Sequence, residues 1–138
     1  MTNEEHKAIV RRFFNAFVAN DQATIKEVLA PDYAAHAPGA PGPLDRETVA
    51  QRIGTLTAAF SELRGTIEDQ IAEGDKVVTR LTWGGTHTGD FFGLAPTGKP
   101  VVVSIVSIER IKDGRIAERW VHQDDLGLMQ QLGAVPPM

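Results

Sequence analysis

The sequence predicts an α+β domain in which helices come first and antiparallel strands follow. Up to about residue 63, apolar residues recur with helical spacing, and from residue 66 they alternate as they do in strands. Asp113-Gly114, between two apolar segments, is a typical hairpin turn. The length of 138 residues fits one domain, residues 1–138. We therefore expect a bent antiparallel sheet wrapped over the helices, with a cone-shaped cavity between them.

Three helices are expected in the N-terminal part, and each begins at a recognisable cap. Thr2 and Glu5 can form a capping box for a helix over residues 3–19, which carries a stripe of phenylalanines. Asp21 can cap a short helix over residues 23–29. Asp45 can cap a third helix that runs to about residue 63. The intervening Asp32–His36 segment is expected to form no more than a strand fragment.

Four long antiparallel strands and a terminal helix are expected in the second half. The strands span residues 66–72, 77–88, 100–111 and 115–124, and the helix begins near residue 126. Gly84-Gly85 predicts a bulge in the second of these strands. A two-residue turn at Asp113-Gly114 pairs Lys112 with Arg115, which places Glu109 opposite Glu118 and Ile105 opposite His122.

The last strand has one face of mixed chemistry. Alternation places apolar, aromatic and ionisable side chains together: Ile116, Glu118, Trp120, His122 and Asp124. A core face would be apolar and a solvated face polar, so this mixture favours a pocket wall. The other interpretation, a half-exposed strand end that leads to a helix cap, is equally consistent with this stretch alone.

Composition excludes several classes of function. The net charge is −4 and Lys and Arg form no run, which disfavours binding to nucleic acid or to an anionic membrane. There is no Cys, no Gly-rich phosphate loop and no clustered set of metal ligands, so neither metal nor cofactor is expected. The N-terminus is polar and no apolar run is long enough to span a bilayer, from which a cytoplasmic location is expected.

The chain resembles the SnoaL-like polyketide cyclases, also called predicted ester cyclases, which have the nuclear-transport-factor-2-like cone fold. Short motifs in a characteristic order carry the resemblance: Asp32-Tyr33 with His36, Gly85-Thr86-His87-Thr88-Gly89, Gly93 before Pro96-Thr97-Gly98-Lys99, Asp113-Gly114, and Glu118, Trp120, Asp124, Gly127-Leu128 and Gln131-Leu132-Gly133. The resemblance covers nearly the whole chain. The residues after the tryptophan, Val121 and His122, depart from the acidic or amide residue that is common there.

The resemblance implies a cofactor-independent intramolecular aldol cyclisation of a polyketide ester, with an aspartate as acid/base. That role maps onto Asp124, because proton abstraction next to a carbonyl needs a carboxylate held in a dry pocket. Alternation puts Asp124 towards the cavity and the adjacent Asp125 outwards, where Asp125 can cap the terminal helix. His122 is the second catalytic candidate, for orienting the substrate or polarising its carbonyl group.

Several other side chains are candidates for substrate binding. His36 and His87 are expected to line the cavity on the strength of the resemblance, and each is otherwise an ordinary buried or exposed histidine. Arg80 either faces the cavity, paired with a carboxylate such as Glu118, or points to solvent; Arg80 and His87 share the cavity only if the glycine pair is a bulge. The remaining candidates are either pocket walls or ordinary core: Trp83, Trp120 and Tyr33.

The expected substrate is a small, apolar, carbonyl-bearing molecule. Two alternatives stay open: another enzyme of the same fold, of epoxide hydrolase or ketosteroid isomerase type, and a non-catalytic module that binds a hydrophobic ligand. An epoxide hydrolase would need Arg80 beside Asp124 and a glutamate, Glu109 or Glu118. A homodimer is expected, because the broad sheet has apolar positions on both faces and needs a cover.

Overall fold

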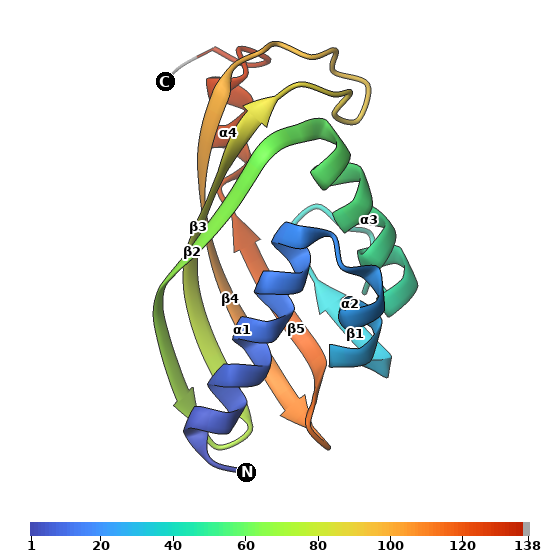
Figure 1. Ribbon diagram of the computed structural model, residues 1–138, viewed down its shortest axis with the longest axis vertical. Coiled ribbons are helices and arrows are strands. Elements are labelled where there is room, and N and C mark those ends of the chain that lie inside the picture. Colours follow the sequence, from blue (N-terminus) through green and yellow to red (C-terminus); the bar gives the residue numbers. More distant parts are fainter. Residues whose placement is uncertain (137–138) are drawn as a thin grey trace.

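The computed structural model describes residues 1–136 and has the predicted α+β architecture. Figure 1 shows a long curved sheet whose concave face is covered by helices. In chain order the elements are α1 (Asn3–Ala19), α2 (Gln22–Val28), β1 (Leu29–His36), α3 (Arg46–Ala59), β2 (Phe60–Glu73), β3 (Lys76–His87), β4 (Pro100–Lys112), β5 (Arg115–Gln123) and α4 (Asp125–Gln131). The expected α+β cone is therefore confirmed.

The sheet has five strands in the order β1-β5-β4-β3-β2. Strands β2 to β5 pair antiparallel, as expected, and β1 adds a parallel edge strand next to β5. The expectation of a mere strand fragment at Asp32–His36 is thus wrong. The partner of β1 is a strand about 80 residues later (His36 pairs with Trp120), so no local pattern could reveal the pairing.

The helix starts follow local capping and agree with the sequence. The Thr2 side chain accepts a hydrogen bond from the Glu5 N–H, and the reciprocal bond completes the capping box. Asp21 and Asp45 cap α2 and α3, and each accepts the N–H of the threonine three residues later. The end of α3 was misplaced: the helix stops at Ala59, and Phe60 already begins β2.

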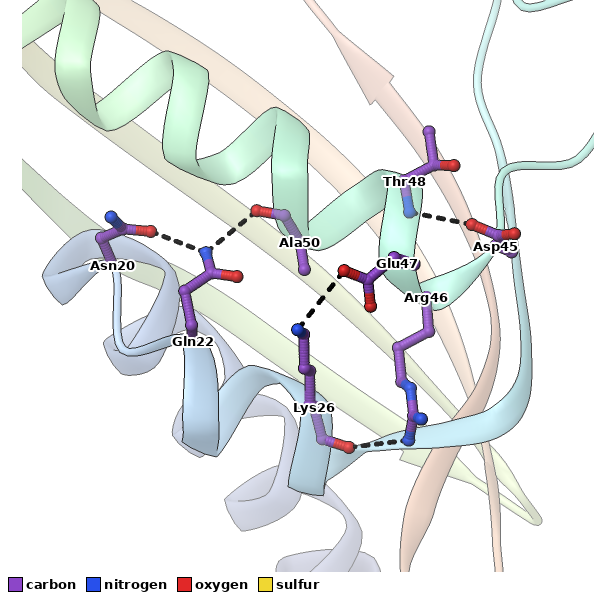
Figure 2. Close-up of polar contacts among 8 residues, drawn as sticks. All are labelled: Asn20, Gln22, Lys26, Asp45, Arg46, Glu47, Thr48 and Ala50. Atoms are coloured by element: carbon purple, nitrogen blue, oxygen red, sulfur yellow. Dashed lines mark hydrogen bonds and ion pairs between the residues drawn. The ribbon is translucent and has the colours of Figure 1, made fainter.

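Polar contacts fix α3 against α2, as Figure 2 shows. The Gln22 side chain donates to the Ala50 carbonyl at 2.9 Å, and the Arg46 guanidinium donates to the Lys26 carbonyl at 3.0 Å. Lys26 also pairs with Glu47 at 3.4 Å. These bonds tie carbonyl groups at the end of α2 and along α3 to side chains, and they hold α3 as one wall of the interior.

A bulge in the β4–β5 hairpin changes the predicted pairing. The turn at Asp113-Gly114 pairs Lys112 with Arg115 as expected, but Arg110 then pairs with Glu118 and Ala117 is the extra residue. Glu109 therefore lies opposite Arg119 and not opposite Glu118. The predicted register would have set two carboxylates against each other, whereas the bulge sets a carboxylate against a guanidinium.

The predicted bulge at Gly84-Gly85 is wrong. The β3–β4 ladder is regular through both glycines, and the irregularities lie in β2 instead. A side chain at either position would crowd β2: a Cβ on Gly85 would lie 3.1 Å from the Ser61 carbonyl oxygen, and one on Gly84 would displace the flexible Arg64 guanidinium, which is 2.9 Å away. The pair therefore provides space for β2 and does not reverse the faces of β3.

The core lies between the concave face of the sheet and the helices. Its largest fully buried apolar side chains come from both layers: Phe13, Phe60, Ile25, Leu29, Ile116 and Leu128. Within the described residues, every helix is too short or too polar to cross a membrane.

Candidate active site

The main cavity lies between α3, β1, β5 and the loop that follows β3, with a volume of about 270 Å³. Its walls are mostly apolar: Phe17, Val49, Ile53, Leu56, Ile105 and Val121. Three charged side chains and one amide interrupt these walls, namely Arg52, Arg119, Asp125 and Gln123. Arg52, Asp125 and Phe92 are exposed and mark the mouth, whereas Arg119 is buried. An apolar cavity with a few convergent polar groups is the usual form of a small-molecule site.

A second cavity of about 220 Å³, the side cavity, lies between α1 and strands β2 and β3. Phe17 and Ile105 line both cavities and form the partition between them. Trp83 and Leu81 line the side cavity from β3. The interior is therefore lined by α1, by Leu81 and Trp83 of β3, by Ile105 of β4 and by alternate residues of β5, with α3 and β1 as additional walls.

A chain of hydrogen bonds orients the carboxylate at the mouth. The Trp83 indole N–H donates to Gln123 Oε1 at 3.0 Å, which leaves the amide nitrogen of Gln123 pointing the other way. That nitrogen donates to Asp125 Oδ1 at 2.8 Å. Because Trp83 is buried, the chain holds the exposed Asp125 against a rigid part of the core.

Asp124 and Asp125 have exchanged the positions predicted for them. Asp124 is the N-cap of α4, and its Oδ1 accepts the Gly127 N–H at 2.9 Å. Asp125 lines the cavity. The physical reason is the bulge at Ala117, which shifts the alternation of β5 by one residue and turns Arg119, Val121 and Gln123 inwards.

The same shift places the other predicted β5 residues on the convex face of the sheet. His122 is exposed there and, with Trp120, Val106, Ile108 and Lys76, lines a shallow open groove. Glu118 bridges two neighbours: Oε2 contacts His36 Nε2 at 2.7 Å, and Oε1 accepts from Arg110 Nε at 3.2 Å. The expectation that His122, Glu118 and Trp120 face the cavity is therefore wrong.

His36 belongs to this convex-face cluster as well. Its ring stacks on Trp120 with 5.5 Å between ring centroids, and the hydrogen bond from His36 is the main cause that lowers the pKa of Glu118. Ala35, its neighbour in β1, lines the main cavity, so alternation turns His36 away from it. The expectation that His36 lines the cavity is wrong for this reason.

Arg80 and His87 lie on opposite faces of β3. Arg80 is exposed and pairs with Asp69 through Nε at 2.9 Å and Nη2 at 2.6 Å. His87 is fully buried among aromatic rings, and its Nδ1 accepts the Thr97 N–H at 3.2 Å. His87 thus supports the loop after β3 without lining either cavity. The arrangement of Arg80 with Asp124 and a glutamate, which an epoxide hydrolase would need, does not form.

A buried ion pair lies beside the main cavity. Arg119 Nε donates to Glu109 Oε2 at 3.2 Å, and Thr79 Oγ1 donates to Glu109 Oε1 at 3.1 Å. Burial raises the pKa of Glu109, and the Arg119 charge opposes that rise. Tyr33 is buried nearby, and burial raises the pKa of its hydroxyl to about 12, so Tyr33 stays neutral. Tyr33 is therefore part of the core beside the site and does not line either cavity.

Sequence reasoning missed all four polar residues of the main cavity: Arg52 on α3, and Arg119, Gln123 and Asp125 along β5 and just beyond it. The alternation grouped the last three correctly on one face but assigned that face to the outside. Charge complementarity across the hairpin, Glu109 with Arg119, was the available signal for the correct register. Among residues 1–136, no three His, Cys, Asp or Glu side chains converge as metal ligands would.

Several proteins with similar sequence or structure are described as cyclases. The chain is 30% identical over 131 residues to aklanonic acid methyl ester cyclase DnrD of Streptomyces peucetius, covering 91% of this chain and 88% of that protein. It is 31% identical over 121 residues to nogalonic acid methyl ester cyclase of Streptomyces nogalater, covering 86% and 90%. The structure of IdmH from Streptomyces antibioticus, provisionally assigned as a polyketide cyclase, superposes with a TM-score of 0.83 at 33% identity, covering 93% and 98%.

The sequence model of one protein family spans most of the chain. The model for SnoaL-like polyketide cyclases matches residues 8–132, which include all the helices and strands that surround the cavities apart from the first turns of α1. The order of helices and strands, the cavity between them and the similarity to known cyclases all fit this family. The chain belongs to the SnoaL-like polyketide cyclase family.

Proposed function

We propose that the protein is a cyclase that closes a ring in a polyketide ester by an intramolecular aldol reaction, with Asp125 as the acid/base. The carrying observation is that Asp125 is the one carboxylate among the described residues that line the main cavity. The similarity of the whole chain to two methyl ester cyclases supports an ester as the class of substrate. The apolar walls suit a carbon-rich molecule whose carbonyl groups supply the reactivity.

The chemistry requires one proton transfer in each direction. Asp125 removes a proton from the carbon next to a carbonyl group, and the resulting enolate attacks a second carbonyl carbon of the same molecule. The new alkoxide then takes a proton from the Asp125 carboxyl group, which restores the carboxylate. Gln123, held by Trp83, keeps one carboxylate oxygen fixed so that the other can face the substrate.

The test compares two neighbouring aspartates. Asp125→Asn should lower turnover of an aklanonic-acid-type methyl ester by on the order of 10²–10⁴, the usual contribution of a general base. Asp124→Asn is the matched control, because it makes the same change one residue away at a helix cap. Turnover would be followed by chromatography of the cyclised product. Full activity of Asp125→Asn, or a larger loss in Asp124→Asn, would contradict the assignment.

The convex face of the sheet supports a homodimer. Apolar side chains on it are left in solvent: Val102 is 57% exposed, Val106 46% and Ile108 36%. Such a surface would be covered by the same surface of a second copy. Light scattering coupled to size-exclusion chromatography should give a dimer for the wild type and a monomer for Val106→Lys. A wild-type monomer at micromolar concentration would contradict the dimer.

A further inference from the structure

Arg119 is the buried cation of the main cavity, and its guanidinium is only partly used. The residue is 6% exposed, and its Nε is bonded to Glu109. Its Nη2 is enclosed and has no hydrogen-bond partner among the described residues; the neighbouring Tyr33 hydroxyl, on which the Arg119 charge acts, has none either. Phe13 and Phe14 lie under the guanidinium at 5.4 and 5.1 Å from the ring centroids. A buried donor without a partner destabilises the folded protein. A ligand that accepts a hydrogen bond from Nη2 would offset this cost in the bound state.

The buried ion pair between Arg119 and Glu109 is expected to add little net stability to the fold. Desolvating two charges offsets most of their attraction, and well-packed apolar residues often stabilise a core as well. Thr79 and Glu109 nevertheless hold Arg119 in one orientation beside the main cavity. A guanidinium held in this way, with a donor to spare and aromatic rings beneath it, is suited to an oxygen on an apolar ligand.

Arg119 lies far from the proposed base. Arg119 and Gln123 project from the same face of β5, and a rise of about 3.3 Å per residue puts their Cα atoms roughly 13 Å apart. Asp125 lies beyond Gln123, at the exposed mouth. Arg119 is therefore separated along β5 from the carboxylate that would deprotonate the substrate. A ligand that reaches both groups must be elongated.

We propose that Arg119 anchors a carbonyl or phenolic oxygen at the far end of an elongated substrate, opposite the end that reacts. The inference deepens the proposed function and rests on it for the position of the reacting end. Binding energy at the remote end would orient the molecule against Asp125, as remote contacts do in many enzymes. Arg119 would thereby select fused or extended polyketides that carry an oxygen acceptor at the distal end.

The test measures binding without turnover, so it stands apart from the test of cyclase activity. Naphthalene and naphthol would be titrated against the wild-type protein by ligand fluorescence. Naphthol should bind on the order of 10-fold more tightly, as expected for a hydrogen bond with a charged donor. The double variant Arg119→Met/Glu109→Met removes both charges together and should bind the two compounds with equal affinity, so the readout is the ratio of the two affinities within each protein.

Two further variants keep the test decisive. Arg119→Lys keeps a cation beside Glu109 and should preserve the fold. The single ammonium group cannot contact both Glu109 and the ligand in the way that the larger guanidinium can, so the naphthol preference should fall. Arg80→Met removes an arginine from the convex face and should leave the preference as it is. Wild-type protein without a naphthol preference, or a preference that survives in either Arg119 variant, would overturn the proposal. If the Arg119 variants lose the naphthol preference but Asp125→Asn keeps its cyclase activity, Arg119 is the anchor and Asp125 is not the base.

Discussion

The two faces of the β4–β5 hairpin carry the same pair of residue types one step apart. On the concave side Glu109 lies opposite Arg119, and on the convex side Arg110 lies opposite Glu118. The concave pair is buried, and burial raises the pKa of Glu109 in spite of its partner. On the convex side, the hydrogen bond from His36 lowers the pKa of Glu118. Surroundings, and not residue type, therefore decide which pair is costly and which is a minor surface contact.

The largest expected effect comes from breaking the concave pair. Glu109→Gln keeps the shape but leaves Arg119 charged and buried, because a guanidinium does not lose its proton in proteins. The free energy of unfolding should fall by about 3–5 kcal/mol, the usual cost of an uncompensated buried charge. Urea denaturation followed by circular dichroism measures it.

The double variant with methionine at both positions provides the control. Removing both charges should cost much less than removing one, because neither partner is left unpaired. If Glu109→Gln proves as stable as the wild type, the pair is hydrated in solution and the contrast between the two faces fails.

Sequence patterns located the helices and four of the five strands of this fold but placed the β5 site residues on the wrong face. The caps Thr2, Asp21 and Asp45 act within four residues, so helix starts could be read locally. The face of β5 depends on one bulged residue, Ala117, whose effect is set by pairing with β4. A shift of one residue exchanges every inward side chain for an outward one, which is why Asp124 was expected in the cavity in place of Asp125.

The next effect separates the two aspartates at the end of β5. Asp124→Ala removes the cap of α4 and should lower the free energy of unfolding by about 1 kcal/mol. Asp125→Ala removes no cap and should have a smaller effect on stability, although it should abolish most turnover. Thermal melting of both variants gives the comparison. An equal or greater destabilisation by Asp125→Ala would mean that its bond to Gln123 supports the fold more than the site.

The smallest effect is expected on the convex face. Glu118→Gln removes a partly exposed charge that contacts His36 and Arg110, and such pairs contribute up to about 1 kcal/mol. The pKa of Glu118 is lowered in the folded state, so its contribution is present above the unfolded-state pKa and disappears as the pH falls through the folded-state pKa. Wild type and variant should therefore differ at neutral pH and converge in acid.

Urea denaturation of both proteins between neutral and acidic pH measures this difference. Added salt should shrink the difference at neutral pH, because exposed charges are screened. A difference that persists unchanged in acid would show that the introduced amide perturbs packing around Trp120, and that charge is not what distinguishes the convex cluster. A loss as large as that of Glu109→Gln would place both pairs in the same environment, most directly because a second copy of the chain buries the convex face.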